Sequence, residues 1–292
     1  MTRIGFVGFG EAGVAIASGL HGAGARELAA FDVAASGDRD DVFAERAQAS
    51  GVALLDDLAM LVEHSDVVLS LVTARVALQV ARDAAAGLRE GQLFVDLNSL
   101  APGRKGNAAH IVEERGARFV DAAIMTAVPP HRHRVPILLS GSGAAALRDC
   151  MEPYGMRLEV LNDQPGTASA VKLCRSLLVK GVEALLWDSL LVADQYGAAA
   201  RVLASVGDTL HGDWEQLASY LMGRTVLHGP RRAAEMDEAA RMVADAGFGP
   251  GLGVAIADRL RAVAAMNPDM AAEADLPADY AAFLRTFDES NR

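Results

Sequence analysis

The sequence predicts an α/β protein in which a doubly wound, mostly parallel sheet is followed by an all-α C-terminal domain. Up to about Glu159, short runs rich in Val, Ile, Leu and Phe alternate with Ala-rich segments of helical length, which is typical of βαβ units. After Gly166 this alternation ends, and apolar residues recur at helical spacing almost to the end of the chain. We therefore expect a Rossmann-type domain over residues 1–163 and an all-α domain over residues 164–292.

Composition excludes several classes of protein. The chain has 292 residues, of which 51% are hydrophobic and 22% are charged, so it can build a buried core and does not resemble a disordered chain. Single cores stop growing at roughly 250 to 300 residues, which favours two domains. A formal net charge of -11 and a sequence pI near 5.1 oppose binding to nucleic acid or to acidic membranes. We expect neither as a partner.

Two further features favour a cytoplasmic protein. The chain has two cysteines, Cys150 and Cys174, too few for a disulfide framework or a multi-ligand metal site. No apolar run reaches the ~18 residues that a membrane span needs, and the N-terminus enters a strand pattern without the features of a signal peptide. We expect no bound metal, and a protein that works unprocessed in the cytoplasm.

The expected strands of the first domain are short apolar runs bounded by turn residues. They cover residues 4–7, 28–31, 51–54, 67–71, 93–97, 119–123 and 136–140. Between the fifth and sixth strands, Ser99 is placed to cap a helix that has Pro102 in its first turn. That helix is expected to run to about Glu114 and to stop at Gly116.

The second domain is expected to open with a long helix from about Thr167 to Gln195. Apolar residues occupy most of the circumference of this helix, as expected where neighbouring helices or a second subunit enclose it. We therefore expect a homodimer in which these helices pack across subunits. Further helices are expected over residues 199–206, 214–222, 231–246 and 253–265.

The turn after the first strand carries a glycine pattern. The pattern GxGxxG comes directly after this strand and at the start of an apolar helix. The first glycine permits a tight turn, the second lets the backbone approach a pyrophosphate, and the third allows close packing of helix on strand. The helix N-terminus offers unpaired N–H groups to the phosphates. This context predicts a dinucleotide site made of Gly8, Phe9, Gly10, Glu11, Ala12 and Gly13.

An acidic residue at the end of the second strand supports the same site. Asp32 follows Gly13 by nineteen residues, which is the spacing expected of the residue that binds the adenosine ribose. Its carboxylate can accept hydrogen bonds from both ribose hydroxyls and would repel a 2′-phosphate, so NAD is favoured over NADP. NADP remains the less favoured alternative, because Arg39 in the following loop could meet a phosphate.

Two further loops lie where a cofactor would extend. In an open α/β sheet, ligands sit beyond the carboxyl ends of the strands. The loop after the fourth strand contains Leu71, Val72 and Thr73, and the loop after the fifth contains Asn98 and Ser99. We expect these five residues to contact the cofactor, with the nicotinamide near Thr73 and Ser99. The alternative role of such polar residues is helix capping.

Lys172 is the candidate acid/base. It lies one to two turns into the apolar helix that opens the second domain, so we expect it to face a cleft between the domains rather than bulk water. A partly desolvated lysine can exchange a proton with a substrate hydroxyl or carbonyl oxygen while hydride passes to the nicotinamide. The alternative is a lysine that extends its amine out of a buried helix or pairs with Glu183.

These residues resemble the β-hydroxyacid dehydrogenases, a family that includes 3-hydroxyisobutyrate dehydrogenase, tartronate semialdehyde reductase and 6-phosphogluconate dehydrogenase. The resemblance extends to about residue 196. In that family GxGxxG opens the chain, an acid at the position of Asp32 marks NAD users, and a GxxGxGxxxKxxxN segment supplies a catalytic lysine. Here the glycine pattern falls on residues 8–13 and the lysine on Lys172, so the resemblance implies a dehydrogenase with Lys172 as its acid/base.

Three departures from the family concern the substrate and the second domain. The family's Asp-Ala-Pro-Val-Ser-Gly-Gly substrate loop reads Asp-Ala-Ala-Ile-Met-Thr-Ala at residues 121–127, so its serine and both glycines are absent. The asparagine four residues after the lysine is replaced by Ser176, with Arg175 beside it. The Lys-Asp-Leu segment of many members is also absent. The tail around residues 228–236 resembles a subgroup with its own C-terminal helical domain.

The loop after the altered segment offers replacement contacts. Its two prolines stiffen the backbone that presents two arginines, whose guanidinium groups suit carboxylate, phosphonate or phosphate; a solvated surface loop is the alternative. His131 and His133 in this loop lack a third metal ligand. The expected contacts of an anionic small-molecule substrate are Asn98, Ser99, Met125, Thr126, Arg132, Arg134, Arg175 and Ser176.

These features predict an NAD(P)-dependent oxidoreductase that transfers a hydride between a nicotinamide cofactor and an anionic hydroxy compound of the hydroxy-acid type. If the hydroxyl lies β to a carboxylate, the oxidised product can lose carbon dioxide, as the resemblance to 6-phosphogluconate dehydrogenase allows. Two alternatives remain. An imine reductase shares this architecture but usually has another residue at the position of Lys172. A non-catalytic NAD-binding sensor would account for the altered substrate loop.

Overall fold

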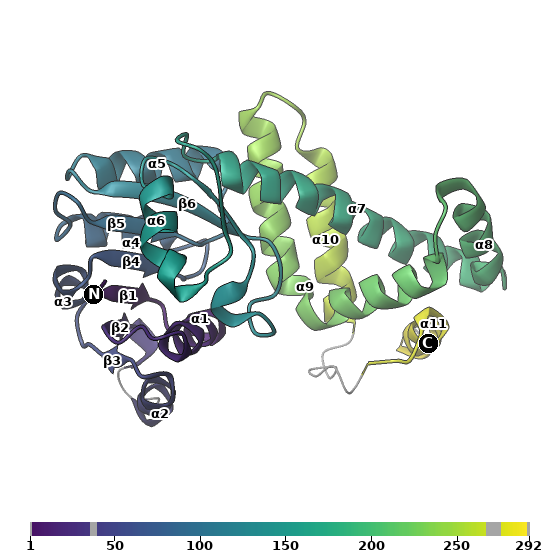
Figure 1. The fold of residues 1–292 in the computed structure, drawn as a ribbon. Coiled ribbons are helices and arrows are strands. Elements are labelled where there is room, and N and C mark those ends of the chain that lie inside the picture. The colour runs from purple at the N-terminus through teal and green to yellow at the C-terminus, as the bar shows by residue number, and fades with distance from the viewer. Residues whose placement is uncertain (1, 36–39, 267–275, 291–292) are drawn as a thin grey trace. The chain divides into compact units, whose positions relative to one another are not determined.

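The computed structural model describes residues 2–35, 40–266 and 276–290. The chain divides into two compact units, residues 1–172 and 173–292. The division falls inside helix α7 (Thr167–Gln195), which contributes its first turns to the first unit and the remainder to the second (Figure 1). The boundary after residue 163 and the roles of the two domains stay predictions.

The first unit contains one eight-stranded sheet. Its strands are β1 (Ile4–Val7), β2 (Leu28–Phe31), β3 (Ala53–Leu54), β4 (Val67–Ser70), β5 (Leu93–Asp96), β6 (Arg118–Ile124), β7 (Ile137–Ser140) and β8 (Leu158–Asn162). They lie in the order β3-β2-β1-β4-β5-β6-β7-β8, and neighbours are parallel except β6 and β7. This arrangement confirms the doubly wound, mostly parallel sheet.

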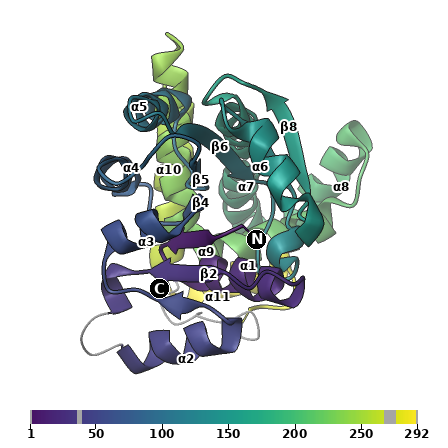
Figure 2. The ribbon, with the colours of Figure 1, turned by 60° about the vertical axis from the view of Figure 1, so that its left-hand side comes forward.

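Helices cover both faces of this sheet. They are α1 (Glu11–Gly22), α2 (Asp40–Ser50), α3 (Leu58–His64), α4 (Ala77–Ala85), α5 (Pro102–Glu113) and α6 (Ala144–Met151). Successive strand residues enter opposite cores: Ile4 and Phe6 join the core beneath α1 and α6, whereas Val7 joins the core beneath α3, α4 and α5. Figure 2 shows α4 and α5 on one side of the sheet and α1 and α6 on the other.

Two details of the first unit correct the prediction. Strand β8 was not predicted, because it lies at the sheet edge and its residues are half-buried or exposed, so it lacks the apolar run of a central strand. Ser99 does not cap α5. The residue before that helix is Ala101, which offers no side-chain cap, and Pro102 is its first residue. The hydroxyl of Ser99 bonds to a residue of α7 instead.

The described residues of the second unit form helices and no strand. After the remainder of α7 come α8 (Ala199–Leu210), α9 (Trp214–Asp245), α10 (Gly251–Ala265) and α11 (Tyr280–Ser290). This confirms the predicted helical C-terminal region. Trp187 is fully buried in its core and meets Phe283 of α11 edge-on, with ring centroids 6.2 Å apart. Helix α11 was not predicted, and packing of this kind, rather than a local pattern, supplies most of the stability of a helix in a protein.

Helix α9 corrects the prediction of two separate helices over residues 214–222 and 231–246. It continues through Pro230, which has no N–H to donate to the preceding turn. The packing on α10 accounts for this continuity. A Cβ atom at Gly229 would lie 2.6 Å from Cβ of Ala264 and 2.7 Å from the carbonyl oxygen of Leu260, so the two helices touch here. Close tertiary packing outweighs the local cost of the proline.

Buried ion pairs join α7 to α9 within the second unit. Arg232 donates to the carboxylate of Glu183, which also accepts from Thr225. Lys180 donates to Glu235 at 2.8 Å. Burial lowers the pKa of Lys180, and the charge of Glu235 opposes that shift. Among the described residues, no helix is both long enough and apolar enough to cross a membrane.

Candidate active site

The glycine turn between β1 and α1 has the geometry that a dinucleotide needs. Gly8 has φ +91°, and a Cβ atom there would lie 2.4 Å from the carbonyl oxygen of Leu71. A Cβ atom at Gly13 would lie 2.7 Å from the carbonyl oxygen of Gly8. A Cβ atom at Gly10 would meet nothing within 4 Å. Two of the glycines are therefore required by the turn itself, whereas Gly10 borders open space that a pyrophosphate could fill.

The start of α1 offers backbone donors to an anion. Gly10 precedes the helix and provides no side-chain cap, so the first N–H groups are left to a ligand or to solvent. Gly10 and Glu11 are exposed, and Ala12 is half-buried. Phe9 has its side chain in the core, against Phe6, and only its backbone faces the turn. These residues fit the pyrophosphate of a nicotinamide dinucleotide.

Asp32 is held at the end of β2 by two backbone donors. Its Oδ2 accepts from the backbone N–H of Phe9 at 2.7 Å, and its Oδ1 accepts from that of Ala34 at 2.9 Å. Each carboxylate oxygen keeps a further lone pair, and the side chain is half-buried, so it can accept hydroxyl groups of a ribose. Arg39, the residue that could favour NADP, lies outside the described residues.

The loops after β4 and β5 are tied together by Asn98. Its Oδ1 accepts from the backbone N–H of Val72 at 2.7 Å, and its Nδ2 donates to Ser70 at 3.1 Å and to Asp96 at 2.7 Å. Asn98 is 6% exposed, and its amide forms its hydrogen bonds within the protein. Leu71 is half-buried beside it and Thr73 is exposed. Asn98 thus orders the loop that presents Thr73.

Lys172 and Ser99 meet at the end of β5. Nζ of Lys172, on α7, donates to Oγ of Ser99 at 2.6 Å. Both residues are half-buried. The predicted acid/base and a predicted cofactor contact therefore lie side by side, although they come from segments far apart in the chain. An amine held in this way can pass a proton to or from an oxygen placed beside it.

The predicted substrate loop leads from β6 to a short 3-10 helix, η2 (Arg132–Arg134). Met125 is half-buried and Thr126 is exposed at its start. Both arginines of η2 are exposed, and neither forms an ion pair among the described residues. The turn packs on the second half of α1, where a Cβ atom at Gly19 would lie 2.2 Å from Nδ1 of His133. The structure therefore places both arginines on an ordered turn, and their role in substrate binding stays a prediction.

Two predicted substrate contacts belong to the second unit. Ser176 is 4% exposed, and its Oγ accepts from Nζ of Lys180 at 3.2 Å. Arg175 is exposed. The hydroxyl of Ser176 is thus engaged inside its own unit, and the roles of both residues in substrate binding stay predictions.

Sequence reasoning missed three charged residues that pair with one another inside the first unit. Lys105 of α5 is fully buried, with Nζ 3.1 Å from Oδ1 of Asp96 and 3.2 Å from Oδ1 of Asp121. A lysine in the first turns of a helix is normally solvated, so its own position gave no signal. The usable signal was the pair of aspartates, each within the apolar run of a buried strand, and the structure pairs them on neighbouring strands.

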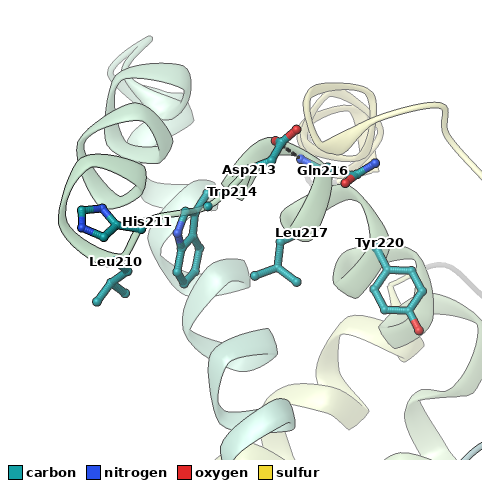
Figure 3. A pocket seen from close by; sticks show the side chains of 8 residues that line it. Leu210, His211, Asp213, Trp214, Gln216, Leu217 and Tyr220 are labelled. Atoms are coloured by element: carbon teal, nitrogen blue, oxygen red, sulfur yellow. Dashed lines mark hydrogen bonds between the residues drawn. The ribbon is translucent and has the colours of Figure 1, made fainter.

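A separate cavity of about 580 Å³ lies in the second unit where α8 meets α9 (Figure 3). It is lined by Leu210, His211, Gly212, Asp213, Trp214, Gln216, Leu217 and Tyr220. Asp213 uses its carboxylate to cap α9, accepting from the backbone N–H of Gln216 at 2.9 Å. Tyr220 accepts from Arg224 at 2.9 Å. These polar groups serve local structure, and we assign the cavity no chemistry.

The fold, the glycine turn and Asp32 define the class of protein: an NAD(P)-dependent oxidoreductase. A family model described as the NAD binding domain of 6-phosphogluconate dehydrogenase matches residues 3–158, more than half of the chain. The chain belongs to this family. A second model, described as a domain of unknown function (DUF1932), matches residues 193–263.

Known relatives agree with this assignment. The structure of a conserved hypothetical protein from Sinorhizobium meliloti is 38% identical, with a TM-score of 0.81 and coverage of 99% of this chain and 97% of that one. A conserved protein of unknown function, described as structurally similar to 3-hydroxyacid dehydrogenases, is 32% identical, with a TM-score of 0.72 and coverage of 89% and 97%. The mitochondrial 3-hydroxyisobutyrate dehydrogenase of Drosophila melanogaster is 24% identical over 70% of this chain and 62% of its own.

Proposed function

We propose that the protein oxidises an anionic hydroxy acid to the carbonyl compound, or runs the reverse reduction, with Lys172 as acid/base. The observation that carries this proposal is the 2.6 Å hydrogen bond from Lys172 to Ser99 at the carboxyl end of β5. The relatives named as 3-hydroxyacid and 3-hydroxyisobutyrate dehydrogenases support a hydroxy acid as the substrate class.

Separate residues bind the cofactor and transfer the proton. The nicotinamide supplies the site that accepts or donates hydride. Residues 8–13 and the start of α1 bind the pyrophosphate. Asp32 accepts hydrogen bonds from the ribose hydroxyls and repels a 2′-phosphate, which favours NAD over NADP. In the oxidation, the neutral amine of Lys172 takes the proton of the substrate hydroxyl. In the reduction, its ammonium returns that proton to the carbonyl oxygen.

The substrate anion needs donors close to this lysine. We assign this role to Thr126 and to the guanidinium groups of Arg132 and Arg134. Met125 completes the loop as an apolar contact, because its backbone N–H already donates to the carbonyl oxygen of Pro136 at 3.0 Å. Their exposure and the absence of ion-pair partners among the described residues support the arginines. Asn98, Ser99, Arg175 and Ser176 complete the proposed set. Loss of carbon dioxide from a β-keto acid product stays within this proposal.

We further propose a cytoplasmic homodimer. Leu178, Leu185 and Val192 follow one another at steps of seven residues along α7, and they are 75%, 66% and 58% exposed. Apolar residues at this spacing form one stripe on a helix, which favours packing on another helix. Both cysteines are free, as expected in a reducing compartment.

Sedimentation of the wild type and Leu185→Glu tests the dimer. We expect a dimer mass for the wild type, a monomer for Leu185→Glu, and a dimer for the control Ala200→Glu on the exposed face of α8. A monomeric wild type at micromolar concentration would reject this part of the proposal.

A substrate panel tests the reaction class. Purified protein is mixed with NAD or NADP and with hydroxy acids, phosphorylated hydroxy acids and neutral alcohols, and nicotinamide absorbance is followed; imines with NADH and NADPH are run in parallel. The proposal expects turnover with an anionic hydroxy acid and a preference for NAD. Turnover with imines alone would support an imine reductase. Tight NADH binding without any turnover would support a sensor.

A further inference from the structure

Four polar side chains form a row across four neighbouring strands of the sheet. Ser70, Asp96, Asp121 and Ser140 are register partners on the neighbouring strands β4, β5, β6 and β7, and all four are buried. Two like charges placed opposite one another on adjacent strands destabilise a sheet. The pair Asp96 and Asp121 therefore requires a cation.

Lys105 is that cation. Its side chain is fully buried, and Nζ lies 3.1 Å from Asp96 and 3.2 Å from Asp121, while it also donates to the carbonyl oxygen of Asp96 at 2.7 Å. The chain contains only three lysines among its 27 basic residues, namely Lys105, Lys172 and Lys180. A buried ion pair costs desolvation and is weak evidence for stability alone, so its role has to be sought in what it holds in place.

One branch of the network holds the start of α7. Oδ2 of Asp121 accepts from the backbone N–H groups of Gly166 at 3.2 Å and of Ser169 at 2.9 Å, and Oδ1 accepts from Oγ of Ser169 at 2.7 Å. Ser140 donates to Asp121 and accepts from the backbone N–H of Ala168 at 3.1 Å. Strand residues thus cap a helix whose own preceding residue is a glycine. Lys172 follows Ser169 by three residues on the same helix.

The other branch holds the loop that carries Ser99. Oδ1 of Asp96 accepts from the backbone N–H of Asn98 at 2.9 Å and from its Nδ2 at 2.7 Å. Oδ2 of Asp96 is buried and finds no hydrogen-bond partner in the part of the chain that the structure describes. Lys105 supplies the positive charge that this carboxylate shares with Asp121. Ser99 is the next residue after Asn98.

We propose that Lys105 is a positioning residue for the reaction. By holding Asp96 and Asp121 together, it links the loop of Ser99 to the first turn of α7, so that Lys172 meets Ser99 at hydrogen-bond distance. Lys105 itself touches neither cofactor nor substrate. The catalytic consequence rests on the proposed role of Lys172, whereas the structural consequence does not.

Substitution of Lys105 tests whether it links the loop of Ser99 to the first turn of α7. In Lys105→Met two buried carboxylates face each other without a cation, and a carboxyl that takes up a proton to relieve this repulsion is a weaker acceptor for the N–H groups of α7. In the double variant Lys105→Met/Asp96→Asn one carboxylate charge is gone, and Asp121 keeps its charge and its role as cap. The double variant should therefore recover what the single variant loses.

Hydrogen exchange followed by mass spectrometry measures directly how well the backbone amides in the first turn of α7 are protected. We expect exchange of the backbone amides of Ala168 and Ser169 to quicken about 10-fold or more in Lys105→Met, and to return most of the way in the double variant. Exchange in the glycine turn, residues 8–13, should stay as in the wild type. The Kd for NADH, measured by nicotinamide fluorescence, should change less than about 3-fold, whereas kcat should fall ~10- to 100-fold because Lys172 is misplaced.

The outcomes separate the two proposals. Unchanged exchange at Ala168 and Ser169 in Lys105→Met overturns the positioning role, whatever the activity. A uniform rise in exchange across the unit also overturns it, because Lys105 then acts on stability alone. Quickened exchange confined to α7 supports the positioning role even if Lys172→Ala retains turnover, in which case the acid/base assignment alone is wrong.

A milder variant covers the case in which Lys105→Met does not fold. Ser169→Ala removes only the hydroxyl bond to Asp121, and we expect a smaller rise in exchange, about 3-fold, at the same amides with a matching fall in kcat. Ser142→Ala is the control. The hydroxyl of this exposed serine donates to Glu113 and accepts from the backbone N–H of Phe119, so its loss should leave exchange in α7 unchanged. If Ser169→Ala behaves like Ser142→Ala, the proposal is rejected.

Discussion

Lys172 and Ser99 are 73 positions apart in the chain, yet Nζ of the lysine donates to Oγ of the serine at 2.6 Å. Ser99 lies just beyond the carboxyl end of β5, on the loop to α5, and Lys172 lies on the second turn of α7. The contact places an amine at the edge of the sheet where ligands of open α/β folds bind. It is the geometric basis for assigning proton transfer to this lysine.

Replacing Ser99 by Ala should lower kcat about 10-fold and leave the Kd for NADH nearly unchanged. The hydrogen bond to a charged amine contributes about 1.5 to 3 kcal/mol, and its loss lets the amine leave its position. Steady-state rates and NADH fluorescence titration measure the two quantities. Ser142→Ala provides the control. A loss of NADH affinity as large as the loss of kcat would mean that a contact of Ser99 with the cofactor, and not its hydrogen bond to Lys172, accounts for the effect.

Gly10→Ala should fold normally and lose cofactor affinity. The added methyl group meets no protein atom within 4 Å, so we expect the Tm to stay within ~2 °C of the wild type, while the group fills the space for the pyrophosphate and raises the Kd at least ~10-fold. Gly22→Ala, at the other end of α1, also meets nothing within 4 Å and should keep both properties. Unchanged NADH binding by Gly10→Ala would remove the glycine turn from the site.

Asp32→Asn should narrow or reverse the preference between cofactors. The amide keeps one oxygen acceptor but no longer repels a 2′-phosphate, so we expect the ratio of the NADPH Kd to the NADH Kd to fall ~10-fold. Titration with both reduced cofactors gives this ratio. Asp57→Asn, at the cap of α3, should leave it unchanged. A constant ratio in Asp32→Asn would place the adenosine ribose elsewhere.

His133 should make the fold less stable in mild acid. Burial lowers its pKa, and the charges of Arg134 and Arg132 add to the shift. Below the ordinary histidine pKa of about 6.5, His133 therefore takes up a proton in the unfolded chain but not in the folded chain. The free energy of unfolding consequently falls as the pH drops toward the lowered pKa.

Urea unfolding at pH 7.5 and pH 5.5 measures this effect. In His133→Gln the free energy of unfolding should differ less between the two pH values than in the wild type. In His110→Gln, which replaces an exposed histidine of α5, the wild-type difference should remain. Equal pH dependence in the wild type and in His133→Gln would show that the buried imidazole contributes nothing.

The fold was largely predictable because its elements are encoded in local patterns. The observed bounds of α7 are those predicted, since Gly166 precedes its first turn and Gly197 follows its last, with apolar residues at helical spacing between them. The elements that escaped prediction depend on distant contacts. Helix α9 continues through Pro230 because Gly229 packs on α10, and α11 is held by Phe283 against Trp187.

The candidate site was predictable where local sequence determines it and not where it depends on contacts between strands. The glycine turn and Asp32 stand out because backbone geometry restricts which residues can occupy them. The buried position of Lys105 follows from the register that places Asp96 beside Asp121, and no local pattern contains that register. The roles of the substrate residues, including Arg132 and Arg134, stay predictions.

Single-turnover hydride transfer in Lys172→Ala tests the central claim most directly. Enzyme saturated with NAD is mixed with the best hydroxy acid of the substrate panel, and NADH formation is followed by stopped flow, with Val171→Ala on the exposed side of α7 as control. We predict a fall of ~100- to 10,000-fold in Lys172→Ala, with NADH affinity preserved and the control unchanged. Hydride transfer at the wild-type rate in Lys172→Ala would contradict the assignment of Lys172 as acid/base.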